Sequence, residues 1–290
     1  MKTLTAYYFS GTGNTLRALR ALCDVLSTKD VSCTLLPIER QDAISGIDAD
    51  MFCIAYPVHG FNAPTIVERF VRDLPQGKGQ YCFVVKTGGE PLRINNASSL
   101  RIVRILRAKG YRFGAEFHYI MPYNIIFRHS DEMVALMRET LARKVVEDAE
   151  VVLAEREVPL DLSAKARMVA AVVRVEHPAM PLIGKGFRID RDKCVDCGKC
   201  VRDCPTHNIT KVGDKFKFGN RCLGCMRCSF LCPKDAVKIG ILGAWKVNGK
   251  YEFDKAEHGD NPHIIRYCHN SYLRYFGLKS PKNKEKEAKV

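Results

Sequence analysis

The sequence lacks two features of exported and membrane-bound proteins. No apolar run approaches the length that a membrane span needs, and the first residues, Met1-Lys2-Thr3-Leu4, lead into a strand pattern rather than a secretory leader. Structural disulfides suit secreted chains, so they are not expected here either. The sequence therefore predicts a cytoplasmic protein, kept in a reducing environment, with no membrane span.

Two common nucleotide-binding motifs are also missing. Residues 10–15, Ser-Gly-Thr-Gly-Asn-Thr, join a strand pattern to a helix pattern, but a Walker loop would need Gly-Lys-Ser/Thr and this loop has no lysine. A dinucleotide fingerprint counted from Gly11 would need a glycine at its sixth place, where the chain has Leu16. The absence of this fingerprint disfavours direct oxidation of NAD(P)H.

Cysteine, by contrast, is abundant and concentrated. Eight of the 13 cysteines lie between residues 194 and 232, where the pattern C-x-x-C-x-x-C-x-x-x-C-P occurs twice. Two residues between cysteines let a tight turn aim three sulfurs at one small volume. The runs begin 28 residues apart and indicate an internal duplication. They consist of Cys194, Cys197, Cys200 and Cys204, and of Cys222, Cys225, Cys228 and Cys232.

Structural zinc is the main alternative for paired cysteines. Zinc needs four ligands, usually two at each end of a loop. It has no use for a third cysteine two residues further on, or for the proline that follows the fourth cysteine of each run. The pattern therefore favours iron–sulfur clusters over zinc.

The cysteine-rich stretch resembles the bacterial ferredoxins that hold two [4Fe–4S] clusters. In that family the fourth cysteine of each run binds the cluster of the other run. The resemblance implies one cluster on Cys194, Cys197, Cys200 and Cys232, and a second on Cys222, Cys225, Cys228 and Cys204.

The loop at residues 10–15 is rich in glycine and hydroxyl residues and joins a buried strand to a helix. This arrangement is typical of a phosphate-binding site. Backbone N–H groups at such a helix start point at an anion, and hydroxyl groups add donors. An ordinary helix cap is the alternative. The loop resembles the flavodoxin sequence T/S-x-T-G-N-T, which implies that the FMN phosphate is bound by Ser10, Gly11, Thr12, Gly13, Asn14 and Thr15.

Strand patterns alternate with helix patterns in the first half of the chain. This alternation predicts an α/β fold with a doubly wound, parallel, five-stranded sheet. The flavodoxin resemblance implies the strand order 2-1-3-4-5, with the ligand at the carboxyl ends of strands 1 and 3. We expect strands at 3–9, 32–36, 51–56, 81–86 and 116–121, and helices at 16–26, 65–72, 97–109 and 131–156.

The loops after the third, fourth and fifth strands are expected to surround the flavin ring. Gly60 has no side chain to obstruct close approach, and Tyr56, His59 or Phe61 would stack on the ring. The turn that ends in Asn124 resembles one in flavodoxin–ferredoxin fusion proteins and places Asn124 near the flavin; an ordinary turn after a strand is the alternative. The flavodoxin resemblance implies two further ring-binding loops, Pro57, Val58, His59, Gly60, Phe61 and Asn62, and Thr87, Gly88, Gly89 and Glu90.

The domain organisation follows from these motifs. The connector between the two cofactor domains has a helix pattern from Leu162, which His177-Pro178 should end, and apolar residues that predict packing between the domains. Near the end of the chain, Tyr267-Cys268-His269 and Tyr272–Phe276 predict a short helix that covers the core. We expect a flavodoxin-like FMN-binding domain at 1–157, a helical connector at 158–186, a small α+β ferredoxin-like domain at 187–240 and a C-terminal extension at 241–290.

The formal charge of +14 overstates how basic the working protein is. Each cluster with four thiolates contributes about −2 and a flavin phosphate removes about two more charges, which leaves about +8. Basic residues are spread along the chain, and no nucleic-acid module is recognisable. We expect an acidic redox partner, either a ferredoxin or a reductase or dehydrogenase, and no nucleic acid.

FMN and two clusters on one chain indicate electron transfer, and the whole chain resembles an anaerobic family of flavodoxin-domain proteins with a C-terminal two-cluster ferredoxin. FMN holds one or two electrons and each cluster moves one, so the protein would link one- and two-electron partners. The alternative is an FMN-dependent reductase of a small organic substrate, fed through the ferredoxin domain. Polar candidates near such a substrate are His59, Lys86, Glu90 and Tyr123. A redox sensor is less favoured, because no recognition module accompanies the redox domains.

Overall fold

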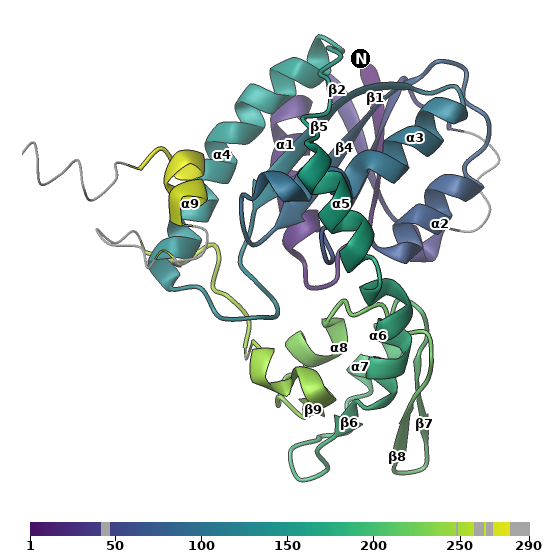
Figure 1. Cartoon of the computed structure of the whole chain (residues 1–290), viewed down its shortest axis with the longest axis vertical. Helices are drawn as coiled ribbons and strands as arrows, with labels where there is room; N and C mark the ends of the chain where they lie inside the picture. The colour runs from purple at the N-terminus through teal and green to yellow at the C-terminus, as the bar shows by residue number, and fades with distance from the viewer. Residues whose placement is uncertain (42–46, 248, 258–263, 265–268, 279–290) are drawn as a thin grey trace, which may run out of the picture.

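The computed structural model describes residues 1–41, 47–247, 249–257, 264 and 269–278. A sheet with helices on both faces forms the larger part, and a smaller cysteine-rich part lies beneath it (Figure 1). Among the helices in these ranges, none combines the length and the apolar character needed to cross a bilayer.

Within the described residues, five parallel strands form the larger sheet in the order β2-β1-β3-β4-β5, which confirms the predicted flavodoxin-like order. The strand bounds lie close to those expected, except that β5 begins at Arg112, four residues before Glu116. The strands are β1 (Lys2–Tyr8), β2 (Val31–Pro37), β3 (Met51–Pro57), β4 (Tyr81–Gly88) and β5 (Arg112–Ile120).

Alternate residues of the central strands pack on opposite faces of the sheet, because strand side chains point alternately to either side. On β3, Met51 and Cys53 join one core, while Phe52 and Ile54 join the other. Every residue of β3 from Met51 to Tyr56 is buried, as expected for a central parallel strand covered on both faces.

Two pairs of helices cover the two faces (Figure 1). The longest helix begins after Ser130, whose hydroxyl accepts a hydrogen bond from the Met133 N–H at 3.3 Å, and Asp131 and Glu132 favour its positive end. One face carries α1 (Asn14–Ser27) and α4 (Asp131–Leu153); the other carries α2 (Thr65–Asp73) and α3 (Leu100–Ala108), with the short turns η1 (Ile38–Arg40) and η2 (Arg93–Ser99) nearby.

The connector, which the structure describes throughout, forms two helices, α5 (Ala164–Val173) and α6 (Glu176–Lys185). The expectation that His177-Pro178 ends the helical region is therefore wrong. Pro178 falls in the first turn of α6, where a backbone N–H has no helical partner in any case, so its ring is tolerated. Pro181 lies further inside α6.

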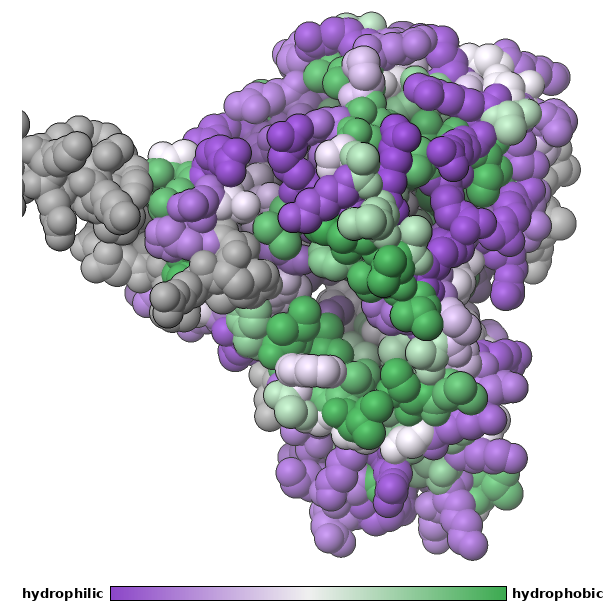
Figure 2. Space-filling model, viewed as in Figure 1, coloured by the Kyte–Doolittle hydropathy of each residue, from purple (hydrophilic) through white to green (hydrophobic). Residues whose placement is uncertain are grey.

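The connector contacts both parts of the molecule. Arg174 forms two hydrogen bonds, at 2.7 and 2.6 Å, to the buried carboxylate of Glu68 on α2. Gly184 of α6 packs so closely on the cysteine-rich part that a Cβ there would lie 2.3 Å from the Cys222 Cβ. Not all of its apolar residues pack, however: Figure 2 shows a hydrophobic surface over α5 and α6, which includes the exposed side chains of Met168, Val172, Val175 and Leu182.

The duplication in the sequence is repeated in the backbone of the cysteine-rich part. Helix α7 (Lys199–Arg202) corresponds to α8 (Arg227–Phe230), and strand β7 (Ile209–Val212) to β9 (Val237–Lys238), each 28 residues on. β9 pairs with β6 (Arg188–Ile189) and β7 with β8 (Lys215–Phe218), both antiparallel. Positive φ angles recur at matching positions, Asp196 and Gly224, Gly198 and Met226, and His207 and Asp235.

Beyond the cysteine-rich part the chain returns to the larger domain. After the 3₁₀ turn η3 (Gly240–Trp245), Phe253 packs into the core beneath α1 and α4. Helix α9 (His269–Phe276) then lies beside α4 (Figure 1), and Tyr272 and Phe276 are buried in the same core. The predicted short helix that covers the core is confirmed from His269 to Phe276, and Tyr267 and Cys268 lie outside the described residues.

Removing one partner of a buried ion pair should destabilise the sheet beside η2. The Lys86 side chain is fully buried, and its ammonium lies 2.9 Å from the carboxylate of Glu116. Burial lowers the pKa of Lys86, and the neighbouring Glu116 opposes that shift. Glu116→Gln would leave the ammonium without a counter-charge, so we expect a loss of about 3 kcal/mol in unfolding free energy, measured by urea denaturation at neutral pH.

The matched control is the double variant Lys86→Met/Glu116→Leu. It removes both charges and keeps apolar volume, so it should recover most of the lost stability. A Glu116→Gln protein as stable as the wild type would show that the pair contributes nothing.

Candidate cofactor sites

Four loops meet at the carboxyl edge of the sheet, where the strand order reverses between β1 and β3. Side-chain hydrogen bonds tie them together. The Thr15 and Thr87 hydroxyls lie 2.8 Å apart, and the Asn14 amide donates to the Pro122 carbonyl at 2.7 Å. The Asn124 amide donates to the Thr12 hydroxyl at 3.1 Å. The first loop is thus held by the loops that follow β4 and β5.

These loops form one wall of a cavity of about 460 Å³, a volume typical of small-molecule sites. Predicted flavin-site residues make up most of that wall: Ser10, Gly11, Thr12, Asn14, Thr15, Pro57, Val58, His59, Gly60, Phe61, Thr87, Gly88, Gly89, Glu90 and Asn124. Gly13, with a φ of 105° just before α1, borders a neighbouring hollow instead. The Asn62 amide turns toward α5 and donates to the Ala170 carbonyl at 2.9 Å.

The opposite wall comes from segments that the sequence did not point to. Helix α6 contributes Glu176 and Met180, the second cysteine run contributes Met226, and η3 contributes Trp245. No spacing in the chain links these residues to the loops, because they approach only when the two parts dock. The apolar character of the connector, which predicts packing between the domains, is the one sequence feature that points to this wall.

The cavity suits a molecule with an anionic end and a flat apolar end. Its lining combines the uncharged, hydroxyl-bearing loop at the start of α1 with the apolar side chains of Met121, Ile183 and Trp245. Gly60 lines the cavity with backbone alone. Its φ is 48°, and a Cβ there would lie 2.0 Å from a Glu176 carboxylate oxygen. FMN has this pattern of phosphate and ring, so the residues present fit it.

Two further sequence-based expectations for this cavity, beyond Gly13 and Asn62, are wrong. Tyr56 does not line it, because alternation along β3 points its ring into the buried core beneath α2 and α3, so it cannot stack on a flavin. Lys86 is buried against Glu116, away from the cavity. The aromatic side chains that do line the cavity are His59, Phe61, Tyr123 and Trp245.

Titratable groups in the cavity have shifted proton affinities. Burial raises the pKa of Glu90 to about 7, and the Tyr123 hydroxyl donates to its carboxylate. Burial also raises the pKa of Glu176. His59 shifts the other way: burial, and then the charge on His177, lowers the pKa of His59 to about 4. At neutral pH the cavity therefore holds a neutral imidazole and a carboxyl group that can still carry its proton.

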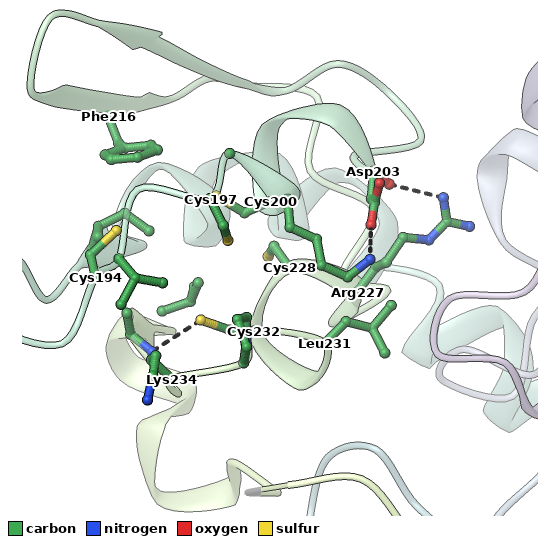
Figure 3. A pocket seen from close by; sticks show the side chains of 17 residues that line it. Cys194, Cys197, Cys200, Asp203, Phe216, Arg227, Cys228, Leu231, Cys232 and Lys234 are labelled. Atoms are coloured by element: carbon green, nitrogen blue, oxygen red, sulfur yellow. Dashed lines mark hydrogen bonds and ion pairs between the residues drawn. The ribbon is translucent and has the colours of Figure 1, made fainter.

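The eight cysteines of the two runs separate into two groups. Burial raises the pKa of Cys200, and the next largest influence is the negative charge of Cys232. Figure 3 shows Cys232 at the same hollow as Cys194, Cys197 and Cys200. The fourth cysteine of the second run thus lies with the first run, as the ferredoxin resemblance implies.

The remaining cysteines form the second group. Burial raises the pKa of Cys228 most, and the nearby negative charges of Cys225, Cys222 and Cys204 raise this pKa further. Cys204, the fourth cysteine of the first run, therefore lies with the second run. Cys228 also borders the first hollow, so it stands between the two groups.

Backbone N–H groups point at matching sulfurs in the two copies. The Asn208 N–H donates to the Cys204 sulfur at 3.2 Å, and the Ala236 N–H, 28 residues on, donates to the Cys232 sulfur at 3.2 Å. Such bonds stabilise thiolates and tune the potential of iron–sulfur clusters. Within the described part of the chain, no three cysteine, histidine or carboxylate groups converge on a single ion; the thiolates of a four-iron cluster bind four different irons and surround them instead. The donor set fits [4Fe–4S] clusters.

The cavity and the second cysteine group share a wall. Gly224 and Met226 line the cavity and flank Cys225. The Gly11 backbone packs on the Cys225 backbone, so that a Cβ on Gly11 would lie 2.6 Å from the Cys225 carbonyl oxygen. The candidate phosphate loop therefore touches a candidate cluster loop directly.

Comparison with known proteins bears on the cysteine-rich part first. Residues 187–209 match a family described as a 4Fe-4S binding domain. A ferredoxin from Methanothermococcus thermolithotrophicus is 38% identical over 55 residues, which are 18% of this chain and 92% of that ferredoxin.

Two other matches are less informative, one because it covers little of the related protein and one because its structural similarity is low. Indolepyruvate oxidoreductase subunit IorA from Methanothermobacter thermautotrophicus is 35% identical over 74 residues, which are 23% of this chain but only 12% of that subunit's length. A flavodoxin from Streptococcus pneumonia TIGR4 aligns with 53% of this chain and 99% of its own, with 18% identity and a TM-score of 0.42. That overlap adds nothing to what the strand order already shows.

The crosswise grouping of the cysteines predicts which substitutions act on the same cluster. Cys204→Ser and Cys222→Ser should each lower the iron content from about eight to about four per chain, and the double variant should lose no more. Pairing Cys204→Ser with Cys194→Ser should remove nearly all iron. The measurement is iron per chain after anaerobic purification.

Cys33→Ser is the control, because Cys33 is half-buried and lies outside both runs; it should keep all the iron. If the Cys204/Cys222 double variant lost twice as much iron as either single variant, the grouping would be wrong.

Glu90→Gln should remove a pH-dependent loss of unfolding free energy in the flavin-free protein. The folded chain holds the Glu90 proton up to a pKa of about 7, against an ordinary value of 4.5 in the unfolded chain. Wild-type stability should therefore fall as the pH rises between these values and stay low above them. At about 1.4 kcal/mol per pKa unit the cost reaches about 3 kcal/mol, so the variant should be the more stable protein near pH 8 and equal to the wild type near pH 4.5.

Urea denaturation at the two pH values makes the comparison. Glu157→Gln, whose carboxylate is exposed, serves as the control. An equal stability gap at both pH values would mean that Glu90 does not titrate as described.

Proposed function

Because this chain belongs to the 4Fe–4S ferredoxin family through its cysteine-rich part, we propose that it is an electron-transfer protein that holds FMN and two [4Fe–4S] clusters and links one- and two-electron redox partners. When bound, FMN accepts one or two electrons and each cluster carries one. The role of the polypeptide is to hold these groups close together and to set their surroundings.

One observation carries this proposal: the shared wall between the cavity and the second cysteine group. A carrier that passes electrons between unlike groups needs them close and at a fixed separation. The packing of Gly11 on Cys225 and the presence of Met226 in the cavity wall provide that closeness without a flexible arm.

Residues of the flavodoxin-like domain have separable roles in the proposal. The loop from Ser10 to Thr15 binds the phosphate through uncharged donors. The loops at 57–61 and 87–90, together with Asn124, surround the ring. Glu90, with a pKa of about 7, can hold or release a proton in the cavity at neutral pH, which two-electron chemistry on a flavin requires.

The partner that we propose is an acidic redox protein, a ferredoxin or a reductase or dehydrogenase, in a reducing cytoplasm. The basic charge of the chain favours such a partner. The match to IorA, a protein whose name makes it a subunit of an oxidoreductase, supports a partner of that class. Cys197 is exposed, so the first cysteine group lies near the surface that a partner can reach.

A second candidate function, reduction of a small organic molecule, has one observation in its favour. A chamber of about 320 Å³ adjoins the cavity and shares His59, Glu176 and Met180 with it. Arg69 and Arg221 line the chamber, so it would suit an anionic substrate. A substrate there would have to reach the cavity past Glu176.

Thr12→Ala/Asn14→Ala should weaken FMN binding by about 100-fold or more, because each charge-assisted hydrogen bond contributes about 1.5 to 3 kcal/mol and two side chains are removed. The iron content should not change, since neither residue is one of the eight cysteines. Titration of anaerobically purified, flavin-depleted protein with FMN measures the dissociation constant. Thr28→Ala, at the far end of the same helix α1, is the control.

The proposal as a whole is tested by mixing the loaded protein with reduced ferredoxin under anaerobic conditions. The visible absorbance of both the flavin and the clusters should fall, at a rate that decreases with added salt. Wild-type protein that retains no FMN, or flavin that stays oxidised while the clusters are reduced, would refute electron transfer between the sites.

A further inference from the structure

Arg227 extends from the cysteine-rich part into the first loop of the sheet. Its guanidinium donates to the carbonyl oxygens of Ser10 at 2.8 Å, Gly11 at 3.1 Å and Asp203 at 2.9 Å. It also pairs with the Glu39 carboxylate at 2.6 Å, and only 14% and 11% of the two side chains are exposed. A single buried side chain therefore joins the loop after β1 to both cysteine runs.

These bonds fix the direction of the loop's N–H groups. In a planar trans peptide the carbonyl and the following N–H point to opposite sides. Because Arg227 holds the carbonyls of Ser10 and Gly11, the N–H groups of Gly11 and Thr12 are turned away from the guanidinium. That leaves two backbone donors for an anion on the other side of the loop.

Only the second copy of the cysteine repeat has a side chain at this position that bonds to the first loop of the sheet. The counterpart of Arg227 is Lys199, 28 residues earlier, and it forms an ion pair with Asp203 on its own helical turn. The counterpart of Asp203 in the second copy is Leu231, which has no charge to hold the guanidinium. Arg227 therefore bonds to the larger domain, whereas its counterpart Lys199 forms its ion pair within the cysteine-rich part.

We infer that Arg227 is a positioning residue that couples FMN binding in the first domain to occupation of the second cysteine group. The inference rests on the proposed function. Arg227 begins the four-residue helix α8, between Cys225 and Cys228, so its place depends on how those two cysteines are held. Small metal domains fold together with their metal, so an empty second group would release the helix and, with it, the loop's carbonyls.

Coupling of this kind acts in both directions. If an occupied cysteine group strengthens FMN binding by some factor, bound FMN must strengthen the hold on that group by the same factor. Arg227 thus gives the chain a means to favour the fully loaded protein over either half-loaded form.

Arg227→Gln should raise the FMN dissociation constant about 10-fold while the iron content stays at the wild-type level. Arg227→Lys keeps the charge but cannot bond two carbonyls with a planar fork, so its dissociation constant should lie between the two. The second measurement is iron release to a chelator: added FMN should slow it in the wild type and have no effect in Arg227→Gln.

Lys199→Gln is the matched control, because it changes the equivalent residue of the first copy; it should bind FMN like the wild type. Equal FMN affinity in Arg227→Gln and the wild type, with iron intact in both, would overturn the inference and leave the proposed function standing. If Arg227→Gln lost iron, Arg227→Lys with intact iron and wild-type affinity would overturn it. Wild-type protein that binds no FMN would overturn the inference and the proposed function together.

Discussion

A contact between two backbones sets the geometry of this molecule. The Gly11 backbone lies against the Cys225 carbonyl with no room for a side chain between them. Any residue larger than glycine would push the candidate phosphate loop away from the cysteine loop, and the cavity wall that Met226 completes would open. The positions of both candidate cofactor sites therefore depend on one narrow point of packing, which the hydrogen bonds and ion pair of Arg227 hold from the side.

The cavity is built by convergence rather than by any single domain. The sheet supplies loops at its carboxyl edge, bound to each other through Thr12, Thr15 and Asn124. The connector supplies Glu176 and Met180, and η3 supplies Trp245. The flavodoxin-like domain alone would leave this edge open to water. Inside the cavity, burial raises the pKa of Glu90 to about 7.

Features encoded by local spacing were predictable from the sequence. The alternation of strands and helices predicted a parallel α/β sheet, and the flavodoxin resemblance implied its strand order. The two cysteine runs identified eight sulfurs, which the structure brings into two groups. Features that depend on packing between distant segments were not. Tyr56 was expected at the flavin ring, yet the alternation along β3 directs it to the opposite core. Glu176 and Trp245 carry no motif, because their place at the cavity follows from docking alone.

The exposed residues of the connector show the same limit. An apolar helix pattern predicts burial, but Val172 and Val175 face outward on α5 and beyond its end. Their neighbours Ala166 and Ala170, on the same helix, are the ones that pack against η2. A period in the sequence identifies an apolar helix, but the side on which the helix meets the sheet is decided by other contacts, here the bonds from Arg174 to Glu68.

The path of the chain after η3 has a mechanical consequence. The cysteine-rich part is entered through α6 and left through residues that return to the core, where Phe253 and α9 are anchored. It is thus attached to the larger domain at both of its ends. A module on a single linker can swing out, meet a donor and swing back, whereas one with two anchored ends cannot rotate freely. In the electron-transfer role that we propose, donors and acceptors must therefore come to this protein, because the cysteine-rich part stays beside the larger domain.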